Sequence, residues 1–167
     1  LQPPAATWNK NVTDGKGCSY GLELDGTYHG TRLTTTLAYT LSWSKRYFPE
    51  LHAGWFADQF DNRHKIDITT RYKVTDKISI FAAWTLHSGN RITLPVASIS
   101  QPQLPSDTGK GEMGYLYTEP NNFRLPTYHR LDVGADFRST TKRGNERIWN
   151  ISIYNAYCHL NTMYTKV

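Results

Sequence analysis

The chain has 167 residues, of which 38% are hydrophobic and 20% charged, with a formal net charge of +5 and only two cysteines. This length is enough for one domain with a core, and two cysteines exclude a disulfide-dense scaffold. A transmembrane helix needs roughly 20 mostly apolar residues in a row. Because the apolar runs of this sequence are only a few residues long, a helical membrane protein is excluded.

The first predicted elements are two strands that form a hairpin around His29-Gly30. From Arg32, large and small side chains alternate over about twelve residues, and large residues such as Leu37 and Trp43 share one parity. Residues 19–28 alternate in the same way. Successive side chains of a strand point to opposite faces, so this pattern predicts strands with one large apolar face. Gly30 allows the positive φ that tight hairpin turns use.

Two further hairpins follow with the same period. Residues 65–74 and 78–87 alternate on either side of Thr75-Asp76-Lys77, although Phe81 breaks the polar parity. Residues 130–138 and 149–157 alternate on either side of a polar turn at 139–146. The sequence therefore predicts six strands in three antiparallel hairpins.

The connections between hairpins, roughly residues 45–62 and 88–127, are much longer than the turns within them. Such long loops are uncommon in compact soluble domains, whereas antiparallel membrane barrels have short turns on one side and long loops on the other. The strands also exceed the usual length of five or six residues. We therefore expect an all-β fold, a segment of an antiparallel transmembrane β-barrel with short periplasmic turns and long extracellular loops.

In such a barrel the apolar parity faces lipid and the polar parity faces a wet lumen. Aromatic side chains should then mark the two membrane interfaces. The sequence places these aromatics near strand ends: Tyr20, Tyr28, Tyr39, Trp43, Tyr72, Trp84, Phe137, Trp149 and Tyr157. The eight steps from Tyr20 to Tyr28 span about 21 Å of height for a tilted strand, close to the apolar band of roughly 25 Å.

The alternative is a secreted, soluble β-sandwich or β-barrel that binds a ligand, in which the apolar parity forms the core. We disfavour it because bulky Trp and Tyr lie at the strand ends, where a closed core would taper. The other parity is rich in Ser, Thr, Ala and Gly, which suits a crowded lumen better than a solvated face.

Five stretches resemble the C-terminal part of TonB-dependent outer-membrane receptors, particularly those of Bacteroidota, in the same order along the chain: Tyr39–Phe48 (YTLSWSKRYF), Phe60–Asp67 (FDNRHKID), Ser88–Pro95 (SGNRITLP), Asn122–Gly134 (NFRLPTYHRLDVG) and Trp149–Tyr157 (WNISIYNAY). The resemblance implies an outer-membrane barrel of roughly 22 strands with a plug domain. It also implies uptake of a scarce solute, such as an iron chelate, vitamin, glycan or peptide, with energy supplied through TonB. We expect residues 1–167 to be part of such a barrel, without plug domain, signal peptide or final strands.

The implied partners are outer-membrane lipid, the protein's own plug domain, TonB and a small solute, with no cofactor and no enzymatic activity. Candidate ligand contacts lie in the long loops: Trp55, Phe56, Arg63, His87, Asn90, Arg91 and Tyr117. Charges of mixed sign fall on the lumen parity: Glu23, Asp25, Lys65, Asp67, Arg71, Arg130, Asp132 and Asp136. These charges could contact a plug or a solute, but mutual pairing between strands is favoured.

Other chemistry has weaker support. The positive charge is spread along the sequence, which gives no argument for nucleic acid. His52 and His64 lack the spacing of a metal site. The run from His87 to Asn90 contains hydrolase residue types, but adjacent strand residues point to opposite faces, so an outer-membrane hydrolase is the least favoured alternative. Cys18 and Cys158 fall on the first and last strands, too far apart for a disulfide, and should be free thiols.

Overall fold

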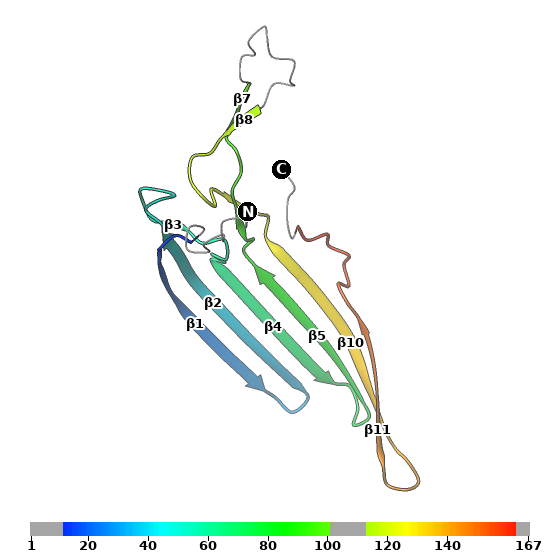
Figure 1. The fold of residues 1–167 in the computed structure, drawn as a ribbon. Coiled ribbons are helices and arrows are strands. Elements are labelled where there is room, and N and C mark those ends of the chain that lie inside the picture. The colour runs from blue at the N-terminus through cyan, green and yellow to red at the C-terminus, as the bar shows by residue number, and fades with distance from the viewer. Residues whose placement is uncertain (1–11, 101–112, 163–167) are drawn as a thin grey trace, which may run out of the picture.

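Six long antiparallel strands form one sheet in a computed structural model that describes residues 12–100 and 113–162. They are β1 (Lys16–His29), β2 (Leu33–Tyr47), β4 (His64–Lys73), β5 (Ile78–His87), β10 (Tyr128–Thr140) and β11 (Glu146–Ile153). Each pairs with the next long strand in the sequence, in the order β1-β2-β4-β5-β10-β11 (Figure 1). The prediction of an all-β fold with six strands in three hairpins is confirmed.

Five short strands lie in the long connections and were not predicted. β3 (Phe56–Ala57) pairs with the end of β2, β6 (Arg91–Ile92) pairs with β9 (Phe123–Arg124), and β7 (Ala97–Ser100) pairs with β8 (Met113–Leu116). All lie at the end of the sheet opposite the three short turns, where the β7–β8 hairpin extends beyond the sheet (Figure 1). The long loops and the short turns therefore occupy opposite ends, as the sequence predicted.

The strand register sorts the side chains onto two faces. Leu24, Tyr39, Ile66 and Leu86 lie opposite one another across β1, β2, β4 and β5. The next row across the same strands, closer to the loop end, lies on the other face and is polar: Glu23, Thr40, Lys65 and His87. The sheet thus has an apolar face and a polar face, each continuous across the six long strands.

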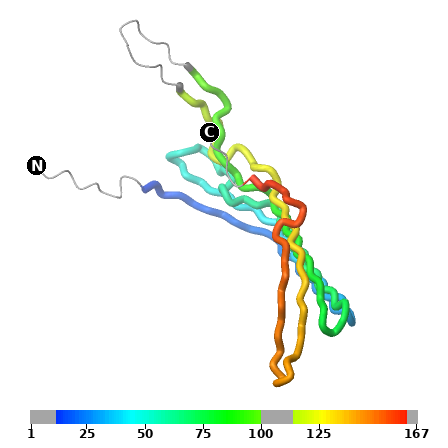
Figure 2. Tube along the Cα trace, turned by 90° about the vertical axis from the view of Figure 1, so that its right-hand side faces the viewer, coloured from blue at the N-terminus to red at the C-terminus, as the bar shows by residue number. Residues whose placement is uncertain are grey.

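No other layer of the described residues covers the apolar face. Phe56 and Leu125, both in the long connections, are the only buried hydrophobic residues in the described part of the chain. In contrast, Leu22, Leu24, Ile151 and Ile153 are exposed on the apolar face, and Trp149 is 69% exposed. Figure 2, turned by 90°, shows the strands as a single layer. The fold therefore has no core under its main sheet within the described ranges.

Among the described residues the sheet is open, with β1 at one edge and β11 at the other. No helix in residues 12–100 and 113–162 is long and apolar enough to cross a membrane.

The last strand is shorter than predicted. β11 ends at Ile153, and the chain then turns through Asn155 and Cys158, which have φ values of 52° and 53°. The Asn155 amide donates to the Asp132 carboxylate at 2.9 Å, which fixes this turn. The prediction that the strand continues to Tyr157 is therefore wrong, because asparagine accepts the left-handed conformation and ends the alternation.

Phe81, the exception in the polar pattern, has a specific partner. It lies directly opposite Gly134 of β10, and a Cβ added at Gly134 would lie 2.5 Å from Phe81 Cζ and 2.7 Å from the Ile151 carbonyl oxygen. The Arg71 guanidinium covers the Phe81 ring at 5.6 Å from its centroid. A large aromatic ring is tolerated on the polar face because the glycine beside it has no side chain.

We predict that Gly134→Ala lowers the free energy of unfolding by about 1–3 kcal/mol, because the added methyl group overpacks this site. Gly26→Ala is the matched control, since a Cβ at Gly26 meets nothing within 4 Å. Denaturant unfolding of both variants under identical conditions measures the difference. Equal stability of the two variants would contradict the close packing of Phe81 on Gly134.

Candidate functional site

The long connections meet at a buried carboxylate, Asp61, which follows β3 and is 2% exposed. Its Oδ1 accepts a hydrogen bond from the Ser44 backbone amide of β2 at 3.0 Å. Asp61 is therefore held against the end of the sheet by the strand that precedes its own loop.

Three arginines from three different segments surround Asp61 Oδ2. Arg124 of β9 approaches it at 2.6 Å, Arg63 at 3.3 Å and Arg91 of β6 at 3.4 Å. Arg124 also donates to the Gly89 carbonyl oxygen at 3.0 Å, and Arg91 to that of Asn121 at 3.2 Å. The contacts of Arg63 and Arg124 are charge-assisted hydrogen bonds, which are stronger than neutral ones, whereas Arg91 Nε makes only an ion pair with Asp61. Together they join the loops into one unit.

Neighbouring contacts reinforce this loop cluster. Arg46 of β2 pairs with Asp58 at 2.8 Å, and the Asn121 side chain donates to the Ala57 carbonyl oxygen, also at 2.8 Å. The Asn122 side chain bonds both the amide and the carbonyl of Leu94 at 2.8 Å. The loops above the sheet are therefore fixed by side-chain to backbone bonds rather than by a large apolar core.

The carboxylates of the loop cluster are strongly stabilised in their charged form. Burial alone would raise the pKa of Asp61, but the Ser44 amide, the Arg124 hydrogen bond and the charges of Arg63 and Arg124 outweigh it, so this pKa lies below its ordinary value. Burial also opposes charge on Asp58, and its bonds to Arg46, the Phe60 amide and Ser44 likewise lower the pKa of that carboxyl. Both groups are anionic at neutral pH.

The loop cluster carries an excess of positive charge. Two carboxylates, Asp58 and Asp61, face four guanidinium groups, those of Arg46, Arg63, Arg91 and Arg124. The three that contact Asp61 have side chains that are 24–33% exposed. These arginines therefore keep part of their surface in solvent while they remain anchored to Asp61.

The polar face of the sheet carries paired charges, but most of these pairs do not join adjacent strands as the sequence predicted. Lys65 pairs with Asp67 at 3.2 Å and Arg130 with Asp132 at 2.9 Å, each within one strand. Two pairs join different strands: Arg138 of β10 with Glu146 of β11 at 3.9 Å, and Arg71 of β4 with Asp136 of β10, which also accepts from Asn150. Because β5 lies between β4 and β10, the Arg71–Asp136 pair crosses an intervening strand. Glu23 and Asp25 form no ion pair with the described residues.

An aromatic group lies on the polar face near the loop cluster. The His87 ring stacks on Tyr128 with centroids 4.6 Å apart, and the Arg130 guanidinium lies 4.2 Å from the Tyr154 centroid. Sequence reasoning selected His87 and Arg130 but missed both tyrosines. Tyr128 precedes the predicted strand at 130–138, and Tyr154 lies on the polar parity of the predicted strand at 149–157, so neither stood out as a site residue.

The predicted loop contacts are only partly brought together. Arg63 and Arg91 meet at Asp61, and the Asn90 carbonyl accepts the Leu125 amide at 2.8 Å. Trp55 is 49% exposed beside Tyr47, and Tyr117 is exposed just beyond β8. Phe56 is instead buried against Phe48, with ring centroids 6.1 Å apart. We therefore assign Phe56 a packing role within the loops.

The segment His87–Asn90 lacks the geometry of a nucleophile and its base. His87 Nδ1 lies 3.0 Å from the Ser88 backbone carbonyl oxygen, and the Ser88 hydroxyl accepts the His64 amide at 3.2 Å. Within the described ranges no group of three or more His, Cys, Asp or Glu side chains is placed to hold a metal ion. Cys18 and Cys158 are both exposed free thiols.

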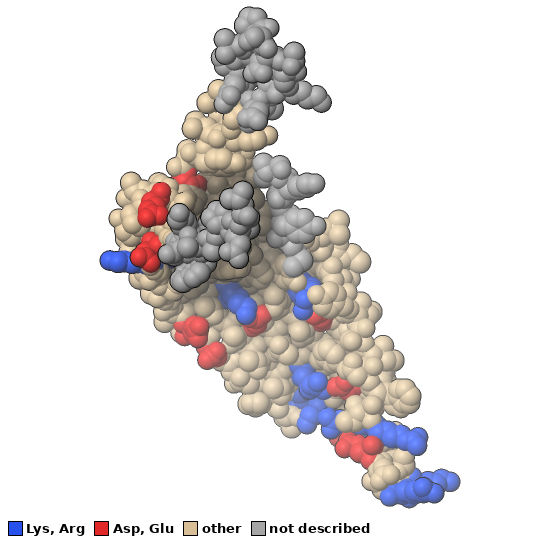
Figure 3. Space-filling model, in the orientation of Figure 1, with Lys and Arg blue, Asp and Glu red and all other residues tan. Residues whose placement is uncertain are grey.

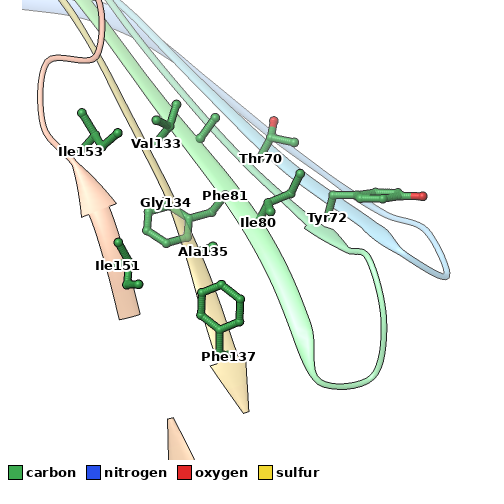
Figure 4. A pocket seen from close by; sticks show the side chains of 11 residues that line it. Thr70, Tyr72, Ile80, Phe81, Val133, Gly134, Ala135, Phe137, Ile151 and Ile153 are labelled. Atoms are coloured by element: carbon green, nitrogen blue, oxygen red, sulfur yellow. The ribbon is translucent and has the colours of Figure 1, made fainter. Parts of the chain in front are cut away.

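The predicted interface aromatics lie on the apolar face, with Tyr157 beside it in the turn after β11. Tyr20 stacks on Trp43 with ring centroids 5.4 Å apart, and the Tyr157 hydroxyl lies 2.8 Å from His129 Nδ1. Trp84, however, lies opposite Ile68 and Leu131, further from the loop end of the sheet than Tyr39 and Trp43. A shallow apolar hollow of about 500 Å³ lies on this face; its lining includes Tyr72, Ile80, Ala135, Phe137, Ile151 and Ile153 (Figure 4).

The loop cluster draws on four of the stretches that carry the family resemblance. Ser44 belongs to residues 39–48, Asp61 and Arg63 to 60–67, Arg91 to 88–95, and Arg124 to 122–134. The co-linear stretches were thus the signal that could have located this site. Comparison of the chain with protein-family models, with curated proteins and with solved structures finds no match.

We predict that acid loosens the loop cluster and that Asp61 is the main cause. Because the pKa of Asp61 is lowered in the folded state, its stabilising contribution is complete above the ordinary value of about 3.9 and is lost as pH falls through the lower folded value. The emission of Trp43, whose ring lies 4.9 Å from the Arg63 guanidinium, should report this transition below about pH 4.

In the Asp61→Asn variant the free energy that keeps the loops ordered should be lower by about 2 kcal/mol already at neutral pH, because three guanidinium groups lose their carboxylate. Asp58→Asn is the matched control and should cost less, since its partner Arg46 is 47% exposed. Superimposable acid titrations of the wild type and Asp61→Asn would show that Asp61 does not hold the loops.

Proposed function

We propose that this chain is part of the wall of an outer-membrane β-barrel, in a receptor that takes up a scarce solute with energy supplied through TonB. The observation that carries the proposal is the uncovered apolar face, which runs across all six long strands. A bilayer removes such a face from water, and a sheet is suitable for hydrocarbon only when its backbone groups are paired. In the complete barrel, further strands would pair with the edges of β1 and β11.

The two ends and the polar face support the receptor assignment. The ends differ as the two sides of such a barrel do, with short turns at one and long connections at the other. The polar face, with its ion pairs, would line the lumen and meet the plug. The loop cluster would hold the extracellular loops, leaving Trp55, Tyr117 and the His87–Tyr128 group to contact the solute.

The soluble alternative requires a second layer to cover the apolar face, and the described residues supply none. The hydrolase alternative requires a base that accepts the Ser88 hydroxyl proton, whereas the neighbouring His87 ring bonds the Ser88 backbone carbonyl oxygen instead. Uptake through a membrane barrel is therefore the function that the geometry supports best.

Neighbouring positions at the centre of β4 test the proposal, because Ile68 lies on the apolar face and Thr69 on the polar face. In the producing cell, Ile68→Arg should lose more than nine-tenths of its outer-membrane recovery, since arginine facing the middle of a bilayer costs about 2–4 kcal/mol. Thr69→Arg should remain close to wild type. Recovery is measured by membrane flotation and immunoblotting.

Wild-type protein in the soluble fraction, or equal recovery of both variants, would contradict a membrane-embedded apolar face. As a second readout, cells are grown with an iron chelate, vitamin, glycan or peptide as the sole source of the nutrient that it supplies. Growth on the transported solute should require both this gene and TonB.

A further inference from the structure

The three short turns carry positive charge equal to the net charge of the whole chain. We count the charges at the three turns and the strand ends beside them, which are residue 32 and segments 73–77 and 138–147. They hold seven Lys and Arg residues but only Asp76 and Glu146 as acids, a net charge of +5. The other residues of the sequence contain twelve basic and twelve acidic side chains and are therefore neutral in total. The seven basic residues form what we call the cationic rim: Arg32, Lys73, Lys77, Arg138, Lys142, Arg143 and Arg147.

The fold makes the cationic rim continuous, although its members are spread along the sequence. The Lys73 amide donates to the Arg32 carbonyl oxygen at 2.7 Å, and the Arg138 amide donates to the Lys77 carbonyl oxygen at 2.7 Å, so adjacent turns are joined. Figure 3 shows Lys and Arg side chains gathered at the lower end of the molecule. The sequence-based description of the charge as spread is thus corrected by the topology.

The cationic rim is exposed and largely free of internal partners. All seven side chains are exposed, and in the part of the chain that the structure describes the rim forms a single ion pair, Arg138 with Glu146 at 3.9 Å. Between the first two turns, Arg32, Lys73 and Asp76 are among the residues that line a hollow of about 460 Å³. The rim therefore offers several cationic groups, and a recess, to an anionic partner.

The cationic rim also adjoins the apolar face. Arg147 shares that face with Trp149 and Ile151, because the register pairs Ser139 with Arg147 and Phe137 with Trp149. The apolar hollow around Ala135 and Ile151 lies four residues up the strand from Arg147, a distance of about 13 Å (Figure 4). An amphiphile could thus place an acyl chain in the hollow and its anionic headgroup at the rim.

We infer that the cationic rim binds the phosphate groups of anionic phospholipids in the leaflet that faces the short turns. The inference rests on the proposed function, because it requires the apolar face to be in a bilayer. Phospholipid is favoured over a soluble anionic partner because the charges lie beside the aromatic side chains Phe137 and Trp149 and continue directly into the apolar face.

The test measures partition of the chain into vesicles of phosphatidylcholine alone and of phosphatidylcholine with phosphatidylglycerol. Lys142→Gln/Arg143→Gln removes two charges from the β10–β11 turn, and Lys16→Gln/Lys45→Gln removes two exposed charges at the loop end of β1 and β2. Each basic residue near an anionic surface strengthens binding roughly fivefold. The turn variant should therefore lose about 25-fold in partition into anionic vesicles, and the control variant little.

In vesicles of phosphatidylcholine alone, both variants should match the wild type, and high salt should remove the preference of the wild type for anionic vesicles. Equal wild-type partition into both vesicles, or equal losses for the two variants, would overturn the inference while leaving the proposed function intact. Partition into neither vesicle would overturn the proposed function and the inference with it.

Discussion

The molecule depends on one constraint: strand pairing places every second side chain on the same face, and most of the large apolar side chains fall on one face. The register keeps this separation across six long strands, so rows such as Leu24, Tyr39, Ile66 and Leu86 continue from strand to strand. The backbone groups between the strands are satisfied within the sheet, which leaves the apolar face as the feature that needs an environment. A bilayer supplies that environment, and the polar face then lines a wet interior.

The loops depend on the sheet in turn. Long connections lose much conformational entropy when they are ordered, and the described loop residues bury only two hydrophobic side chains, Phe56 and Leu125. Asp61 compensates by gathering Arg63, Arg91 and Arg124, and the Ser44 amide ties it to β2. Because one carboxylate joins three segments, the loop end has a defined shape on which exposed groups such as Trp55 can be presented.

The sequence predicted the features that depend on local alternation and missed those that depend on long-range contacts. The six strands, their turns and their two faces follow from a period of two that is readable within ten residues. The pairing of Arg124 with Asp61 joins residues 63 positions apart, and the cationic rim exists only because three separate turns meet at one end. The short strands are two to four residues long, too short for periodicity to reveal. Tyr157 was misplaced because the positive φ of Asn155 ends the strand earlier than its side-chain pattern suggests.

The most direct test of the central claim is the accessibility of spin labels placed one at a time at residues 34–41 of β2, in a Cys18→Ser/Cys158→Ser background in lipid vesicles. If the apolar face is in the bilayer, labels at Leu37, Tyr39 and Leu41 collide preferentially with molecular oxygen, which concentrates in hydrocarbon. Labels at Thr36, Ala38 and Thr40 should collide preferentially with a water-soluble nickel chelate, which gives an accessibility period of two. Equal access of the nickel chelate to both sets, without that period, would show that the apolar face is not in lipid.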